Sequence, residues 1–163
     1  MHAPKNLYDV FVDELKDLHN AEQQLIRALP RMAAAATHDE LRACFREHLE
    51  QTEVHVLRLD HIARLLDLHL SGKRCPAMEG LITEGEEKLA ASGDDSAKDA
   101  SLIGAAQKIE HYEMAGYGTV RSYARLLGYP EIAAILQRTL DEEGATDKRL
   151  TYLAESINVE ANV

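Results

Sequence analysis

Residues 103–127 read IGAAQKIEHYEMAGYGTVRSYARLL. Side chains that recur at intervals of three and four lie on one face of an α-helix, and here that face is apolar except at two positions. It consists of Ile103, Ala106, Glu110, Glu113, Tyr117, Val120, Ala124 and Leu127. The stretch therefore predicts a long helix that turns two carboxylates, Glu110 and Glu113, toward a core otherwise suited to hydrocarbon.

Two other apolar helical faces carry the same kind of interruption. One runs through residues 15–29 and contains Glu22, and the other runs through residues 132–157 and contains Glu143 and Asp147. Burying an ionised carboxylate costs several kcal/mol even after the protein relaxes, so a group of them requires cations or protons. A bound pair of metal ions explains the pattern most simply, because paired ions are held by bridging and terminal carboxylates.

The second helix of the chain gives a weaker signal. Its clearest apolar row is Phe45, Leu49, Thr52, Val56, Leu59, Ala63 and Leu66. Glu50 and Glu53 flank this row, so periodicity alone allows them to face either the core or the solvent. Their place in the first helix pair matches that of Glu143 and Asp147 in the second pair, and we include them in the expected site. The predicted metal ligands are Glu22, Glu50, Glu53, Glu110, Glu113, Glu143 and Asp147.

Helical periodicity dominates the whole chain, and no segment predicts a strand. We expect a single domain over residues 1–163, with one helix pair at about 6–68, a crossover at about 70–95 that carries a short helix, and a second pair at about 96–157. Thr37 and Glu40 have the spacing of a capping box at the start of the second helix. Two helix pairs joined by one long crossover predict an all-α, ferritin-like four-helix bundle.

Composition limits the partners and the compartment. The chain has 163 residues, with 28 acidic against 18 basic side chains and a net charge of -10. This charge argues against nucleic acid or an anionic membrane as the partner. No signal peptide is visible in the first residues, and we expect none; no apolar run is long enough to predict a membrane span. Cys44 and Cys75 have no metal or redox-motif spacing and are expected to be buried free thiols in a reducing, cytoplasmic compartment.

The residue types also indicate which metals would bind. Carboxylate oxygens favour iron, manganese, magnesium or calcium over zinc and copper, and a buried position in a bundle favours two iron ions, with manganese as the alternative. Di-metal bundles usually add imidazole ligands. His55 is two residues beyond Glu53, about 200° around the helix, and is therefore expected to point away from the site. His19, three residues before Glu22, and His111, beside Glu110, are candidates for ligation or hydrogen-bond support.

Several motifs together carry a family resemblance over nearly the whole chain. They are LYDVFVDELKDLHNAEQQL (7–25), HLEQTEVHVLRLD (48–60), CPAMEGLITEG (75–85), AAQKIEHYEMAGYGT (105–119) and LDEEGATDKRLTYLA (140–154). The chain resembles the YciF/YciE-like bacterial stress proteins of the ferritin-like superfamily. The resemblance implies a ferritin-like bundle with a carboxylate-rich di-metal centre, a homodimer, and a cytoplasmic role in the stress response.

The ligand layout is also similar, more distantly, to that of the rubrerythrin diiron domain. That pattern selects Glu22, Glu50, Glu110, Glu113 and Glu143, while Glu53 and Asp147 stand where it has histidines. The expected all-carboxylate ligand set therefore departs from the rubrerythrin pattern, and it would lower the redox potential of the metal pair. The chain lacks the cysteine-rich rubredoxin module, so electrons would have to come from an external donor.

Two classes of function follow from these patterns. The first is a diiron protein that handles iron, O2 or peroxide under stress, with an oxidase or peroxidase activity. The second is a dimeric helical scaffold or binding protein whose metal ions only neutralise buried acids. An iron-storage cage is disfavoured, because the resemblance is to small dimers.

Overall fold

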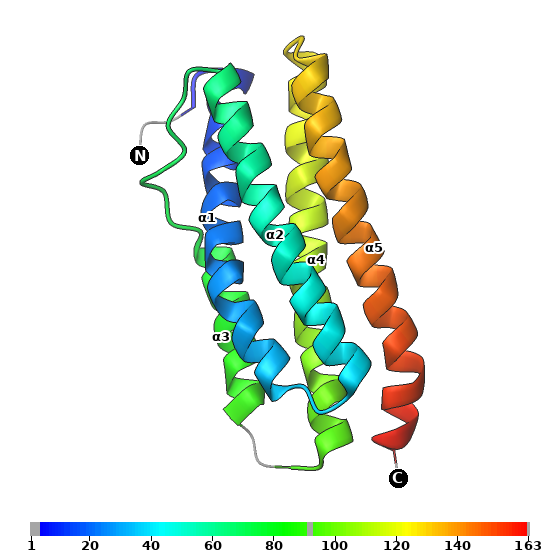
Figure 1. The fold of residues 1–163 in the computed structure, drawn as a ribbon. Coiled ribbons are helices and arrows are strands. Elements are labelled where there is room, and N and C mark those ends of the chain that lie inside the picture. Colours follow the sequence, from blue (N-terminus) through cyan, green and yellow to red (C-terminus); the bar gives the residue numbers. More distant parts are fainter. Residues whose placement is uncertain (1–3, 91–92, 163) are drawn as a thin grey trace.

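The computed structural model describes residues 4–90 and 93–162, and within them it contains five helices and no strand (Figure 1). The helices are α1 (Leu7–Ala35), α2 (Asp39–Leu65), α3 (Pro76–Ala90), α4 (Asp95–Leu126) and α5 (Pro130–Glu160). Four of them, α1, α2, α4 and α5, run the length of a bundle, and α3 lies within the crossover between the two pairs. The predicted all-α bundle with one crossover helix is therefore confirmed.

Local sequence signals set where the long helices begin and end. The Asn6 side chain accepts a hydrogen bond from the backbone N–H of Asp9 at the start of α1, and Asp94 accepts one from Ala97 at the start of α4. Pro130 occupies the first turn of α5, where its missing N–H costs nothing. Gly128 supplies the positive φ of 81° that the turn between α4 and α5 requires.

The predicted capping box of Thr37 and Glu40 does not form. His38 is the residue that caps α2, and its side chain makes no capping hydrogen bond. Thr37 instead turns toward α4, where Asp99 accepts hydrogen bonds from the Thr37 hydroxyl at 2.7 Å and from the His38 backbone N–H at 2.7 Å. A tertiary contact has therefore replaced the local one, and it ties the α1–α2 turn to the second helix pair.

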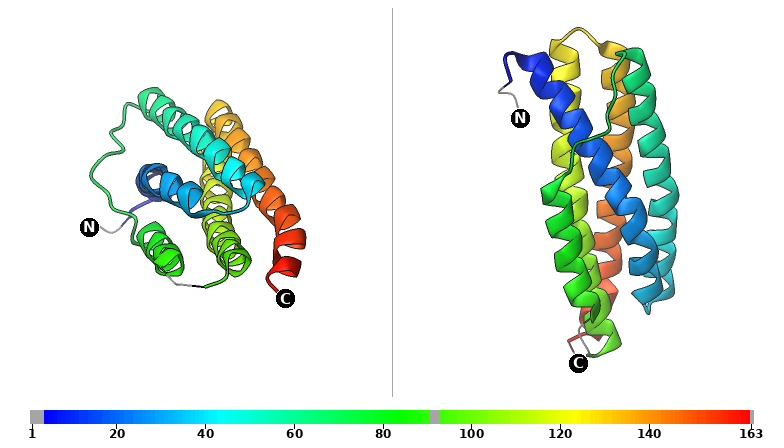
Figure 2. Two further views of the ribbon diagram at one scale, coloured as in Figure 1. Left: turned by 60° about the horizontal axis from the view of Figure 1, so that its bottom comes forward. Right: turned by 90° about the vertical axis from the view of Figure 1, so that its left-hand side faces the viewer.

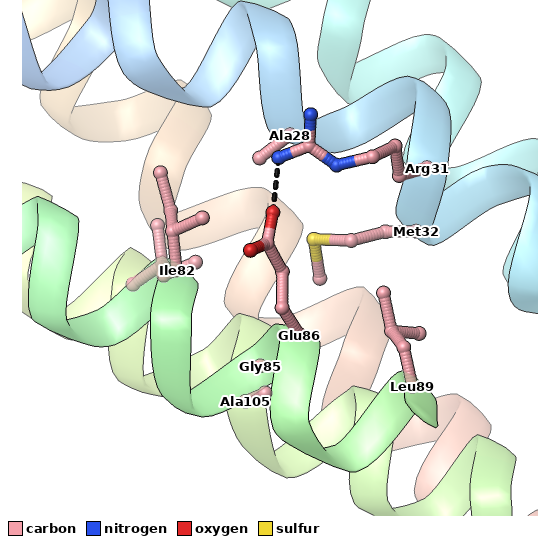
Figure 3. Close-up of a pocket in the computed structure, with 9 residues that line it drawn as sticks. Ala28, Arg31, Met32, Ile82, Gly85, Glu86, Leu89 and Ala105 are labelled. Atoms are coloured by element: carbon pink, nitrogen blue, oxygen red, sulfur yellow. Dashed lines mark hydrogen bonds and ion pairs between the residues drawn. The ribbon is translucent and has the colours of Figure 1, made fainter. Parts of the chain in front are cut away.

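The crossover runs back along α1 after α2 ends, so that α3 packs against α1 and α4 (Figure 2). Figure 3 shows the contact: Arg31 of α1 bonds to Glu86 of α3, and Met32, Ile82 and Leu89 lie around this pair. The void there measures only about 10 Å³. The contact is therefore tightly packed, and α3 acts as a brace on the outside of the bundle.

The bundle core consists of two apolar clusters with a polar layer between them. The first cluster includes Leu25, Phe45, Ile109 and Leu150, and the second includes Leu18, Leu59, Tyr117 and Leu136. On each long helix, the buried glutamate or histidine residues of the polar layer lie between the two clusters. None of the described helices is long and apolar enough to cross a lipid bilayer.

Candidate metal centre

Six buried side chains meet in the polar layer, and each is at most 2% exposed. All four long helices contribute to the group. Its members are Glu22 from α1, His48 and His55 from α2, Glu110 and Glu113 from α4, and Glu143 from α5. We call these six residues the central cluster. Four carboxylates and two imidazoles are the donor set that ferritin-like di-iron and di-manganese bundles use.

The donor atoms of the central cluster form two groups that share one residue. Atoms of His48, Glu110, Glu113 and Glu143 lie within 4.8 Å of one another, and so do atoms of Glu22, His55 and Glu143. Each group offers a place for one ion, and we call them the His48 position and the His55 position. Glu143 alone belongs to both groups, which is the arrangement expected of a carboxylate that bridges two ions.

The distances around Glu143 support a bridging role. Its Oε1 atom lies 3.0 Å from Nδ1 of His55, and its Oε2 atom lies 3.9 Å from Nε2 of His48. Nδ1 of His55 also lies 3.4 Å from Oε1 of Glu22, and Nε2 of His48 lies 3.1 Å from Oε1 of Glu110. The two oxygens of Glu143 thus face different histidines.

Unsatisfied polar atoms show that the central cluster fits metal ions better than internal hydrogen bonds. Each of its six residues has at least one buried oxygen or nitrogen with no hydrogen-bond partner among residues 4–90 and 93–162. Buried polar groups are normally paired, because an orphan costs free energy. Donors that bind one ion at right angles through bonds of about 2.1 Å lie about 3 Å apart without bonding to each other. The spacing around His55 and His48 is of this kind.

The carboxylates change the protonation of the two histidines in the metal-free protein. Burial by itself lowers the pKa of His48, but the charges of Glu110, Glu143 and Glu22 outweigh it and raise the pKa to about 9. Burial likewise opposes protonation of His55, and its contacts with Glu143 and Glu22 raise the pKa to about 11. In the absence of a metal ion, the carboxylates thus favour the protonated, imidazolium form of both histidines.

Burial also favours protons on the acids. Desolvation, with the charges of Glu22 and Glu143, raises the pKa of Glu113 well above its usual range. Desolvation raises the pKa of Glu143 to about 7, although His55 opposes the shift. The Tyr117 hydroxyl donates a hydrogen bond to Glu22, and burial raises the pKa of this phenol far above its usual range. Tyr117 therefore stays a fixed donor that orients Glu22.

Comparison with known proteins identifies the family. The model of the family described as "Domain of unknown function (DUF892)" matches residues 6–162. The chain belongs to the DUF892 family. Protein YciF of Escherichia coli (strain K12) is 44% identical over 151 residues, which cover 92% of this chain and 91% of YciF. The resemblance to YciF-like proteins seen in the sequence motifs is thereby confirmed.

Several solved structures share the fold of this DUF892 chain. The crystal structure of YciF, described as an E. coli stress protein, has a TM-score of 0.92 and 42% identity, and the match covers 94% of this chain and 98% of that one. YcfI of Rhodopseudomonas palustris has a TM-score of 0.88, 37% identity and coverage of 90% and 94%. A two-domain protein of Anabaena variabilis with DJ-1/ThiJ/PfpI-like and ferritin-like domains matches at TM-score 0.60 and 17% identity, over 98% of this chain and 39% of that one. This last match supports the ferritin-like fold alone.

The structure brings four of the seven predicted ligands together. Glu22, Glu110, Glu113 and Glu143 are buried side by side, as their positions in apolar faces predicted. Their role as metal ligands stays a prediction. The all-carboxylate set does not match the central cluster, because the other two donors there are histidines.

The remaining three predicted ligands lie outside the central cluster. Glu50 and Glu53 are exposed on the outer face of α2, because its buried row turns a different side to the core. Asp147 is partly buried one turn beyond Glu143, and its Oδ1 atom lies 3.2 Å from Nε2 of Gln107 and 3.3 Å from Nε2 of His111. Thr146 and Leu150 take the inward positions at that level of α5.

The two histidines of α2 are the members of the central cluster that sequence reasoning missed. The buried row of α2, with spacings that alternate between four and three, consists of Leu41, Phe45, His48, Thr52, His55, Leu59 and Ile62. The expectation that His55 points away was wrong. His55 does lie about 200° around the helix from Glu53. Because Glu53 faces solvent, however, His55 faces the core. His19 and His111 lie elsewhere, beside Asp60 and Asp147.

An ion pair next to the cluster fixes the orientation of His55. Nε2 of His55 lies 2.8 Å from Oε2 of Glu142, and Arg58 donates to both oxygens of Glu142, at 2.6 and 2.8 Å. The Arg58 guanidinium lowers the pKa of Glu142 against the effect of partial burial, so Glu142 stays ionised. A carboxylate that accepts the Nε2 proton leaves the Nδ1 lone pair for a metal ion.

Glu142→Gln should therefore weaken metal binding at the His55 position. We expect the affinity for one of two Mn(II) ions to fall about 10–100-fold, since supporting partners of metal-bound histidines have effects of this size. Calorimetric titration should resolve the weakened ion, with Glu155→Gln, an exposed position on the same helix, as control. Equal loss of both ions, or none, would contradict the assigned role.

Proposed function

We propose that this DUF892 protein binds two metal ions in the central cluster, iron in the first place and manganese as the alternative, and that it uses them to react with O2 or peroxide under stress. The observation that carries the proposal is the set of four buried carboxylates and two histidines that share Glu143. The description of its E. coli relative as a stress protein supports the physiological setting. A redox-active metal pair would supply the electron transfer, and an external donor would restore it.

The protein's own residues would shape this chemistry. Glu143 would hold both ions at once, and Glu142 would keep His55 in the form that binds metal. Tyr117 would restrain Glu22 through its hydroxyl. The two apolar clusters above and below the layer would keep bulk water from the centre.

A comparison of two histidine variants on α2 tests the proposal. His55→Gln removes a donor of the central cluster, and His61→Gln makes the same change at an exposed position of the same helix. The metal-free proteins are supplied with Fe(II) and mixed with hydrogen peroxide, and bound iron, peroxide consumption and folding are measured for each. We expect wild type and His61→Gln to bind iron and consume peroxide faster than free Fe(II), and His55→Gln to fold but to consume peroxide no faster than free Fe(II).

The alternative, a helical scaffold with a structural metal site, predicts a different result. Wild type would then bind metal and gain thermal stability without consuming peroxide or O2 faster than free Fe(II). Absence of metal binding in wild type would refute both versions of the metal centre.

A further inference from the structure

One cavity in the bundle opens toward the central cluster from the side. It lies between α2 and α5, measures about 80 Å³ and is lined by Cys44, Glu47, His48, Gln51, Ala145, Thr146 and Arg149. A cavity needs roughly 10–15 Å³ of such space for each water molecule, so this one has room for several. By contrast, the void on the apolar side of His48, beside Leu25 and Phe45, has no room for a water molecule.

His48, a residue of the central cluster, forms the inner wall of the cavity. His48 is 2% exposed, and its ring joins the two spaces: Nδ1 lies 3.4 Å from the Thr146 hydroxyl in the cavity wall, and Nε2 lies 3.1 Å from Glu110 in the cluster. The outer end is formed by Ala145 and Glu47, which are exposed, and by the partly buried Arg149, which pairs with Glu47. The cavity thus reaches from the surface to the ring of His48, whose Nε2 edge faces the cluster.

The chemistry of the walls suits a divalent cation that has lost part of its water. Gln51 and Thr146 supply neutral oxygen atoms, which can replace water ligands without holding the ion permanently. Burial raises the pKa of the Cys44 thiol to about 11, so it stays protonated and does not trap the ion as a thiolate. The net charge of -10 attracts cations to the protein, and Arg149 is neutralised at the mouth by Glu47.

We propose that this cavity is the entrance through which divalent metal ions reach and leave the central cluster, by way of the His48 position. The inference rests on the proposed metal centre and adds a route to it. The other oxygen of Glu143 faces His55, and the Arg58–Glu142 pair covers the Nε2 edge of that ring. Ions would therefore enter at the His48 position first.

Filling the cavity tests the route. Ala145→Leu places a larger side chain in the opening, and Ala134→Leu makes the same change at an exposed position on α5 away from the cavity. Co(II) is used as the probe, with its absorption followed after rapid mixing, and its release is followed after addition of a chelator. We expect Ala145→Leu to slow loading and release by the same factor, an order of magnitude, with an unchanged dissociation constant.

The ion pair at the mouth provides a second test that does not depend on filling the cavity. Arg149→Gln leaves Glu47 unpaired and should speed Co(II) loading, whereas Glu47→Gln leaves Arg149 unpaired and should slow it. Both effects should shrink at high salt, because screening reduces the field of exposed charges.

The outcomes separate the route from the metal centre itself. If wild type binds no Co(II), the proposed metal centre fails. If wild type binds Co(II) but Ala145→Leu loads as fast as Ala134→Leu, and the two charge variants load alike, the entrance is refuted while the centre stands. A lower affinity in Ala145→Leu without equal slowing of both rates also refutes the entrance.

Discussion

Glu143→Gln is expected to abolish the binding of both metal ions, whereas Glu22→Gln should remove only one. Glu143 belongs to both groups of donor atoms, and Glu22 belongs only to the group around His55. An amide keeps the size of the carboxylate but loses its charge and one acceptor oxygen, so it cannot bridge two cations. Metal analysis after equilibration with Mn(II) should therefore give two ions per chain in wild type, one in Glu22→Gln and none in Glu143→Gln.

Although Glu143→Gln should lose metal binding, it should not destabilise the metal-free protein. Metal-free Glu143→Gln should melt at the same temperature as the metal-free wild type or higher, because it removes one of four crowded carboxylates. Added Mn(II) should raise the melting temperature of the wild type but not that of Glu143→Gln. A ligand at a hundred times its dissociation constant stabilises the folded state by about 2.7 kcal/mol. Glu131→Gln, an exposed change on α5, serves as control and should keep both ions. Retention of two ions by Glu143→Gln would rule out a shared bridge.

The stabilisation that a metal ion confers should grow with pH. In the metal-free protein the pKa values of His48 and His55 are raised to about 9 and about 11. Their contribution to folding is complete below the ordinary histidine value and is lost as pH rises through the raised values. The raised pKa values of Glu113 and Glu143 act the same way, because these carboxyls hold protons more tightly when folded. All four groups make the metal-free protein less stable as pH rises.

Metal binding has the reverse dependence, because an ion needs neutral imidazoles and ionised carboxylates. Melting temperatures with and without Mn(II), measured between about pH 5.5 and about pH 8.5, should therefore diverge as pH increases. The Glu143→Gln variant should show no such divergence. A constant or shrinking difference in the wild type would mean that the ions bind outside the central cluster.

The sequence predicted the fold well because three of the four long helices have clear apolar faces, although Asp147 was wrongly placed on the face of α5. Glu22, Glu110, Glu113 and Glu143 interrupt long apolar rows, and each is buried. The helix ends also followed local signals, apart from the α1–α2 turn, where Asp99 outcompeted the capping box. A contact across 62 residues of chain cannot be read from local spacing.

The second helix shows why the site was predicted only in part. The predicted and the buried row of α2 share Phe45, Thr52 and Leu59, and they differ at the positions in between. At two of these positions the predicted row has Leu49 and Val56, which made it look the more hydrophobic. The buried row carries His48 and His55 instead, and imidazoles look polar until carboxylates of other helices surround them. The decisive interactions are tertiary, so apolar periodicity favoured the wrong row.

The layered core has a consequence for how the protein comes apart. Each end of the bundle has its own apolar cluster, built from all four long helices, while the middle consists of buried ionisable side chains with unpaired polar atoms. Local opening begins where buried apolar contacts are fewest. Without its metal ions, the protein would thus open first in the polar layer while both apolar clusters stay packed. Metal binding would then make the two ends of the bundle unfold as one cooperative unit.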